Sequence, residues 1–341
     1  MKINPKNKKM KNKALRITLT VAVSVLLAII SILALVKIGE RIVFFSFYAK
    51  STTEFKVPGT ADGFIQQGFE KITVDGKELY LTSGYMKKEH SSRVYITDAK
   101  GKSLGYTKLR DENGERNTTH AGGIAVYGDY VYVTNGADDK GIEIFLLKDI
   151  LDENNDVAWC VGTLDVQVAP AFVYVDSQNK TLYTGSFHRD NSVYLSPEKH
   201  KALGAEYGNT ALILAYDITN DGKAISASPK EAYTTPSQVQ GMTFTDSGKL
   251  VLSTSWGVSK SHLLVYDFAE IKKGEDKTTL FGAEIPLYHV TNAIDDVKAP
   301  PMAEELVYDD GKVYIMNESA SAKYIFGKFT SGNYVHTYKV D

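Results

Sequence analysis

Residues 68–86 read GFEKITVDGKELYLTSGYM, which is a strand, a turn at Gly76 and a second strand that ends in small polar residues. Apolar and polar residues alternate at period two on both sides of the turn, as in β-strands. The pattern returns four times, as GGIAVYGDYVYVTNG (122–136), AFVYVDSQNKTLYTGSF (171–187), GMTFTDSGKLVLSTSWG (241–257) and EELVYDDGKVYIMNES (304–319). Self-similarity at a long period is typical of solenoids and propellers. The sequence therefore predicts an all-β propeller.

The spacing of the copies sets the size of the repeat. Successive turns are 52, 51, 69 and 63 residues apart, and a propeller blade of four strands takes roughly 40 to 50 residues. Residues 51–341 provide about 58 residues per blade for five blades and about 48 for six. Five blades are favoured because five copies are visible, and six is the alternative. We expect the ring to close through the stretch 54–58 and the terminal stretch 334–340.

The first fifty residues have a different composition. Residues 17–36 contain no charge, and as a helix they would span about 30 Å, the thickness of the hydrocarbon layer. Residues 1–16 carry seven Lys and Arg and no acid, so the positive-inside rule keeps the N-terminus cytoplasmic and places the rest of the chain outside. A cleaved signal peptide is the alternative, although its apolar core is usually about 7 to 15 residues long.

This pattern predicts four parts: a basic cytoplasmic tail (1–16), a transmembrane anchor in the lipid bilayer (17–36), a juxtamembrane linker (37–58) and an extracytoplasmic β-propeller (59–341). The expected location is the cell membrane, crossed once. Cys160 is the only cysteine, so no internal disulfide can form and the propeller depends on its core for stability. Together with the abundance of Lys, Asn and Tyr, this favours a bacterial cell surface.

The net charge of the chain hides an acidic propeller. The first fifty residues hold 10 of the 39 basic residues and 1 of the 41 acidic residues, so the remainder has a net charge of −11. Such a surface repels nucleic acid and attracts cations or cationic ligands. Basic runs are confined to the N-terminus, so we expect no nucleic-acid partner.

The first strand of each copy supplies the first candidates for a site, because the inner strands of a propeller line its axis. Aligning the copies by their turns brings together Gln67, Gly122, Pro170, Gln240 and Glu304, with His120 just before Gly122. Gln67, His120, Gln240 and Glu304 would then converge on the axis. They would either bind a ligand or satisfy the backbone of neighbouring blades. One Glu among amides and an imidazole suits Ca²⁺ or a neutral polar ligand better than Zn²⁺.

The second strands end in further polar and aromatic residues, at the place where loops on a rigid scaffold carry binding groups. They add Tyr85, His188, Trp256 and Glu318 to the candidate ligand-binding and catalytic residues. Arg93, slightly further along the chain than the first copy, is another candidate ligand-binding residue. Trp256 is either a ligand platform or a packing residue. The GxSxG, HExxH, P-loop and dinucleotide motifs are absent, so the sequence leaves open whether the protein is an enzyme.

The strings QGF…LYLTSGY, HAGGIA…VYVTNG, QGM…STSWG and EEL…VYIMNES resemble the propeller superfamily of gluconolactonases and strictosidine synthase-like proteins. The resemblance covers most of residues 67–323. It implies Ca²⁺-dependent hydrolysis, with the metal held by a Glu, two Asn and an Asp. Glu304 matches that Glu and Asn135 or Asn317 an Asn, whereas Gln67 stands where the superfamily has an acid.

We therefore expect a membrane-anchored propeller that binds a small ligand or a protein partner at the mouth of its channel. A Ca²⁺-dependent hydrolase of lactones or esters is the alternative, with Glu304 as metal ligand and His120 or His188 as base. A quinone-dependent dehydrogenase comes third, because its channel would need stacking aromatic residues and metal ligands that the sequence does not display.

Overall fold

The computed structural model describes residues 5–88, 90–136, 141–274, 276–321 and 323–340. The chain divides into two compact units, Met1–Phe45 and Ser46–Asp341. Helix α1 (Pro5–Val43) makes up the first unit and is followed by the short helix α2 (Phe45–Lys50). The segment Lys13–Val43 contains an 18-residue stretch with a mean hydropathy of 2.9 and is long and apolar enough to cross a membrane.

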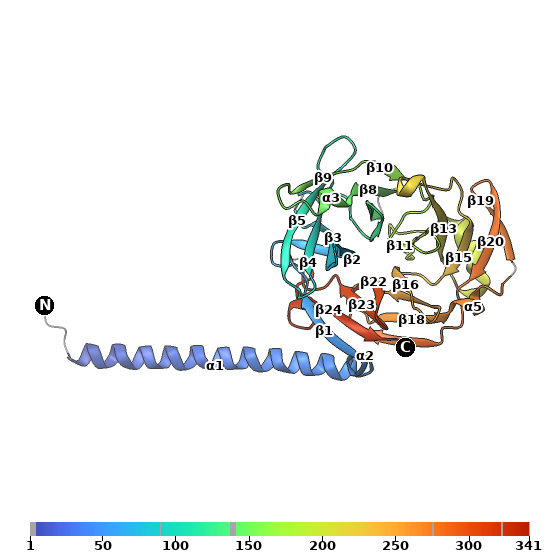
Figure 1. Cartoon of the computed structure of the whole chain (residues 1–341). Coiled ribbons are helices and arrows are strands. Elements are labelled where there is room, and N and C mark those ends of the chain that lie inside the picture. The colour runs from blue at the N-terminus through green and yellow to red at the C-terminus, as the bar shows by residue number, and fades with distance from the viewer. Residues whose placement is uncertain (1–4, 89, 137–140, 275, 322, 341) are drawn as a thin grey trace. The chain divides into compact units, whose positions relative to one another are not determined.

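The second unit is built from sheets in which the chain runs outward strand by strand (Figure 1). Each of the five sequence copies forms the first two strands of one sheet. From the first strand outward, the sheets are β2 (Phe64–Val74), β3 (Lys77–Met86), β4 (Arg93–Asp98) and β5 (Ser103–Arg110); β6 (Ile124–Tyr127), β7 (Tyr130–Thr134), β8 (Ile142–Leu146) and β10 (Gly162–Leu164); β11 (Phe172–Asp176), β12 (Thr181–Gly185), β13 (Ala211–Thr219) and β15 (Glu231–Thr235); β16 (Val239–Phe244), β17 (Lys249–Thr254), β18 (Ser261–Asp267) and β21 (Asp295–Ala299); and β22 (Ala303–Asp309), β23 (Lys312–Asn317), β24 (Tyr334–Lys339) and β1 (Ser51–Lys56).

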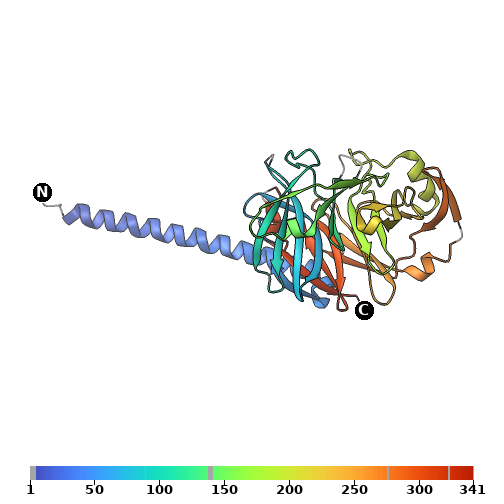
Figure 2. The ribbon, with the colours of Figure 1, turned by 45° about the horizontal axis from the view of Figure 1, so that its top comes forward.

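The first strands of these sheets surround a common axis. β2, β6, β11, β16 and β22 contact one another in chain order, and β22 returns to contact β2, so the five sheets close into a ring. Figure 2 shows the sheets from a second direction. Hydrophobic clusters fill the spaces between consecutive sheets; Leu81 and Val94, for example, pack with Val131 and Phe145. The predicted propeller is confirmed, and the sheets correspond one to one with the repeats.

The ring closes between the two ends of the second unit. β1 pairs antiparallel with β24, with Thr52 opposite Thr337, and β24 pairs with β23. The hydroxyl oxygens of Thr52 and Thr337 are 2.5 Å apart. The expected closure is confirmed, and Ser51–Lys56, within the segment predicted as a linker, belongs to the ring.

Several segments extend the sheets. β9 (Val157–Trp159) adds in parallel to β5, and β20 (Ala283–His289) adds in parallel to β15 and pairs with β19 (Asp276–Leu280). The short strand β14 (Ala224–Ile225) pairs with β13. The connection from β12 to β13 is long and includes α4. Within the described residues, the remaining helical turns are α3 (Leu147–Ile150), α4 (Glu198–Gly204), α5 (Phe268–Ile271), η2 (Ala205–Tyr207), η3 (Asn220–Gly222) and η4 (Ile325–Lys328).

One buried carboxylate links the first strands at the axis. Glu305 of β22 accepts backbone N–H bonds from Phe69 of β2 (3.0 Å), Ile124 of β6 (2.7 Å) and Val173 of β11 (3.4 Å). Gly241 of β16 lies so close to Glu305 that an added Cβ would come within 2.6 Å of the Glu305 Cα atom. All five first strands therefore meet at Glu305.

Candidate functional site

A cavity of about 580 Å³ opens at one end of the ring axis. Its volume lies in the range usual for small-molecule sites. First strands, the ends of second strands and the β12–β13 connection all contribute to its surface. Its lining residues include Gln67, His120, Phe187, His188, Val193, Tyr194, Leu195, Ser196, His200, Gln240, Trp256, Glu304 and Glu318.

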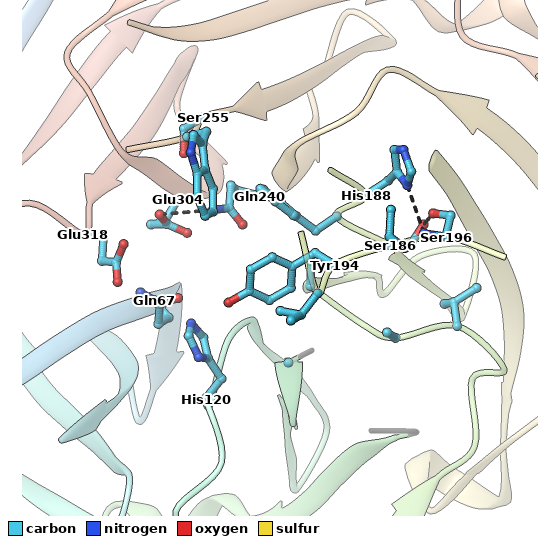
Figure 3. A pocket seen from close by; sticks show the side chains of 18 of the residues that line it. Gln67, His120, Ser186, His188, Tyr194, Ser196, Gln240, Ser255, Glu304 and Glu318 are labelled. Atoms are coloured by element: carbon cyan, nitrogen blue, oxygen red, sulfur yellow. Dashed lines mark hydrogen bonds between the residues drawn. The ribbon is translucent and has the colours of Figure 1, made fainter. Parts of the chain in front are cut away.

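Three of the polar lining residues sit at irregularities in their strands. The pairing register shifts between Gln66 and Gly68 in β2, between Val239 and Gly241 in β16, and between Ala303 and Leu306 in β22. An extra residue at a β-bulge is released from the regular alternation and re-aims its side chain. Gln67, Gln240 and Glu304 occupy these places and are directed into the cavity (Figure 3).

Glu304 and Glu318 form an acidic pair in this cavity. Both are buried, and the amide nitrogen of Gln240 donates to Glu304 at 3.4 Å. Burial, together with the nearby Glu318 and Glu305, raises the pKa of Glu304 well above its usual range. Burial raises the pKa of Glu318 to about 7, against the opposing influence of Lys323 and of hydrogen bonds from Tyr85 and Gln67. Burial therefore favours the protonated form of Glu304, and Glu318 is partly ionised at neutral pH.

Tyr85 connects this pair to a cation and to an imidazole. Its hydroxyl donates to Glu318 at 3.3 Å and accepts from the Lys323 ammonium at 2.6 Å. The ring of Tyr85 also lies 4.5 Å from the ring of His120. Tyr85 thus supports the cavity from behind Glu318 and His120.

Aromatic residues also line the cavity. Trp256 contacts Phe187 and Tyr194 at ring-centre distances of 5.9 and 6.2 Å, and the Arg189 guanidinium lies 4.2 Å from the Trp256 ring. The hydroxyl of Tyr194 points towards Gln67 and His120 (Figure 3). The sequence left open whether Trp256 packs or faces a ligand. In the structure, Trp256 packs against other aromatic rings and also lines the cavity.

His188 is buried in the cavity wall but is not placed as a base for a serine. Its Nδ1 atom accepts the backbone N–H of Ser196 at 2.9 Å. Its Nε2 atom lies 3.3 Å from an Asp190 oxygen, without the alignment of a hydrogen bond. The Ser186 and Ser196 hydroxyls are 3.3 Å apart and contact each other rather than His188. This arrangement lacks the serine-to-imidazole contact that nucleophilic catalysis requires.

Most of the residues predicted from the sequence meet here. Gln67, His120, His188, Gln240, Trp256, Glu304 and Glu318 line the cavity, and Tyr85 supports it. Arg93 does not line it: at the start of β4, two strands out from the axis, its guanidinium stacks on Tyr106 at 4.2 Å. Sequence reasoning missed Tyr194, Leu195 and His200, which belong to a connection without strand periodicity.

The cavity does not fit a Ca²⁺ cage. Ca²⁺ takes six to eight oxygen ligands, and the described residues contain no group of three or more His, Cys, Asp or Glu that could hold a metal ion. Asp165, which also lines the cavity, is exposed; of the two buried carboxyls, Glu304 favours its protonated form and Glu318 lies near Lys323. Neither Asn135 nor Asn317 lines the cavity, and the Asn317 amide donates to the carbonyls of Pro300 and Pro301.

Comparison with known proteins leaves the chain without a family. No protein-family profile and no curated protein sequence matches it. Similar solved structures include a nidogen/laminin complex, with 12% identity, a TM-score of 0.39 and coverage of 75% of this chain and 73% of the other. The PQQ-bound aldose sugar dehydrogenase of Streptomyces coelicolor has 17% identity and a TM-score of 0.43, with coverage of 79% of this chain and 79% of the other. BamB of Moraxella catarrhalis has 11% identity and a TM-score of 0.33, with coverage of 81% of this chain and 83% of the other.

These similarities are too low to transfer a function. The resemblance of the sequence to gluconolactonases and strictosidine synthase-like proteins stays a prediction.

Proposed function

We propose that this protein is a membrane-anchored propeller that binds a small organic ligand in the cavity at the end of its axis. The observation that carries the proposal is the convergence of Gln67, Gln240 and Glu304, from three different sheets, on one cavity of about 580 Å³. Three bulged first strands that each aim a polar side chain into the same space are arranged for binding rather than for packing.

The chemistry of the cavity favours binding over catalysis. Among the lining residues, amides, carboxyls and imidazoles offer hydrogen bonds, and aromatic rings offer apolar contact. The His188 geometry opposes a serine mechanism, and the donor set opposes a Ca²⁺ mechanism. Of these three functions, ligand binding is therefore the one that the cavity can perform without a metal ion or a rearranged catalytic residue.

Binding can be tested by thermal denaturation of the full chain in lipid nanodiscs against a defined library of primary metabolites. A ligand present at one hundred times its dissociation constant stabilises the folded state by about 2.7 kcal/mol. We expect Gln240→Ala to weaken a true ligand roughly three- to tenfold, because one hydrogen bond contributes about 0.5 to 1.5 kcal/mol.

The control variant is Glu70→Gln, since Glu70 lines a separate cavity of about 240 Å³. It should bind the same ligand as the unmodified chain does. If every compound that stabilises the unmodified chain stabilised Gln240→Ala equally, this result would count against the cavity as the binding site.

The anchor and its orientation are part of the proposal. The support is α1, whose apolar segment follows seven basic residues, a pattern that keeps the N-terminus cytoplasmic. We expect the protein to remain in the membrane fraction after high-salt washing, and external protease to degrade the chain beyond about residue 37. A soluble secreted species that begins near residue 40 or 50 would instead identify α1 as a cleaved signal.

A further inference from the structure

The cavity changes in polarity from its depth to its mouth. We define the polar floor as Gln67, Gln240, Glu304 and Glu318, of which Gln67, Glu304 and Glu318 are buried and Gln240 is half-buried. We define the apolar wall as Phe187, Val193, Leu195 and Trp256. The wall residues range from the half-buried Phe187 to the exposed Val193, so apolar side chains line the cavity up to solvent.

The mouth carries apolar side chains that have no cover. Val193 is 87% exposed and Leu195 56%, both in the β12–β13 connection. Val258, two residues after Trp256 in the β17–β18 loop, is 75% exposed. Single exposed apolar residues are ordinary, but a group that is continuous with a cavity indicates a binding surface. These two loops would shield an apolar chain that leaves the cavity.

The polar floor favours a ligand head that carries hydroxyls, which both donate and accept hydrogen bonds. The amide nitrogen of Gln67 donates to the Gln66 carbonyl and that of Gln240 to Glu304. Gln240 keeps a second N–H and a protonated Glu304 carries an O–H, so the floor offers donors beside its amide carbonyls and carboxyl oxygens. Lys323 already lies near Glu318, so a head without charge can enter without adding an unbalanced charge to a buried site.

We propose that the ligand is an uncharged amphiphile, with a hydroxyl-bearing head on the polar floor and a hydrocarbon chain that runs along the apolar wall to the mouth. This inference rests on the proposed function and names the class of its ligand. The head is fixed by hydrogen bonds from its hydroxyls to Gln67, Gln240 and Glu304. The chain is fixed by burial against Phe187, Leu195 and Trp256.

Trp256 gives a direct readout of the chain. The protein has two tryptophans, and Trp159 lies in β9 at the outer side of a sheet, so Trp159→Phe leaves Trp256 as the only indole. We expect a 1-monoacylglycerol with a dibrominated chain to quench Trp256 saturably in nanodiscs of unbrominated phospholipid. Unbrominated 1-monoacylglycerols of increasing length should displace it, about fourfold more tightly for each added CH₂ within the cavity.

Two variants test whether the chain enters the cavity. Ala169 is an exposed lining residue, so Ala169→Phe narrows the cavity without entering the core and should reduce the quenching. Ala269→Phe is the matched control, because Ala269 is exposed on α5 and does not line the cavity. The dibrominated monoacylglycerol should quench Trp256 in this control as strongly as it does in the Trp159→Phe protein.

Three results would overturn the inference. One is quenching by brominated phospholipid alone, without saturable quenching by the monoacylglycerol, which would show that Trp256 contacts the bilayer instead. Another is affinity that does not change with chain length. The third is tighter binding of an alkyltrimethylammonium of the same length, which would replace the uncharged head by a cation.

The result also separates this inference from the proposed function. If monoacylglycerols fail to bind but the metabolite library yields a ligand that is lost in Gln240→Ala, only the amphiphile is wrong. If neither binds, the proposed ligand-binding function falls as well.

Discussion

Replacing Glu305 by alanine should destabilise the ring by about 3 to 5 kcal/mol. The substitution removes the acceptor of three backbone N–H groups, from Phe69, Ile124 and Val173, all of which are buried residues. Each unsatisfied buried donor costs about 1 to 3 kcal/mol, and the three costs are not fully additive. Thermal denaturation should show a fall in the melting temperature of roughly 2 to 4 °C for each kcal/mol.

The control for this prediction is Glu284→Ala. Glu284 is an exposed side chain 3.3 Å from Lys277, and such pairs contribute about 0 to 1 kcal/mol. Glu305→Gln keeps one acceptor oxygen, so its melting temperature should lie between those of Glu305→Ala and Glu284→Ala. A melting temperature of Glu305→Ala equal to that of Glu284→Ala would show that the axis does not depend on this carboxylate.

Removing residues 334–341 should abolish the cooperative unfolding of the ring. The deletion takes away β24, which lies between β23 and β1, so it leaves two strand edges unpaired and opens the closure. Circular dichroism during heating should then lose its single sharp transition. An unchanged melting temperature would contradict the closure.

The converse experiment joins the same two strands covalently. Thr52 and Thr337 face each other across β1 and β24, so Thr52→Cys with Thr337→Cys, in a Cys160→Ser background, should form a disulfide. Cross-links that close loops this long are expected to stabilise by about 5 kcal/mol in the chain-entropy treatment. The reduced protein is the internal control, and equal stability of both forms would show that the strands already stay together in the unfolded chain.

The repeat was enough to predict the architecture because each copy carries its own turn chemistry. Gly76, Gly128, Gly248 and Gly311 all adopt positive φ, which glycine allows at little cost. Alternation on either side of the turn then defines two strands. The sheets could be counted from these local signals, whereas the long β12–β13 connection gave no such signal.

The polar floor was predictable in part. Aligning the turns found Gln67, Gln240 and Glu304, but the bulges that aim them into the cavity depend on pairing with the next strand. Glu305 shows the limit: alternation cannot tell which of two adjacent glutamates faces the cavity and which faces the axis. In the structure Glu304 lines the cavity, and Glu305 accepts hydrogen bonds from the backbone of three other strands.

Apart from Trp256, the apolar wall was beyond sequence reasoning for a different reason. Val193 and Leu195 lie in an aperiodic connection together with Tyr194, which packs against Trp256, some sixty residues further along the chain. Arg93 lies at the start of β4, the third strand of its sheet, and does not line the cavity. Stacking on Tyr106 explains its position better than a ligand does.

The pairing of β1 with β24 also bears on the order in which the chain can fold during synthesis. β1 is among the first segments of the ring to be made, and its partner is the last. Until residues 334–339 emerge, β1 and the free edge of β23 both present unpaired backbone, which is a hazard for aggregation. Nascent chains stalled before residue 334 should therefore depend on chaperones that bind exposed strands, and full-length chains should be released from them.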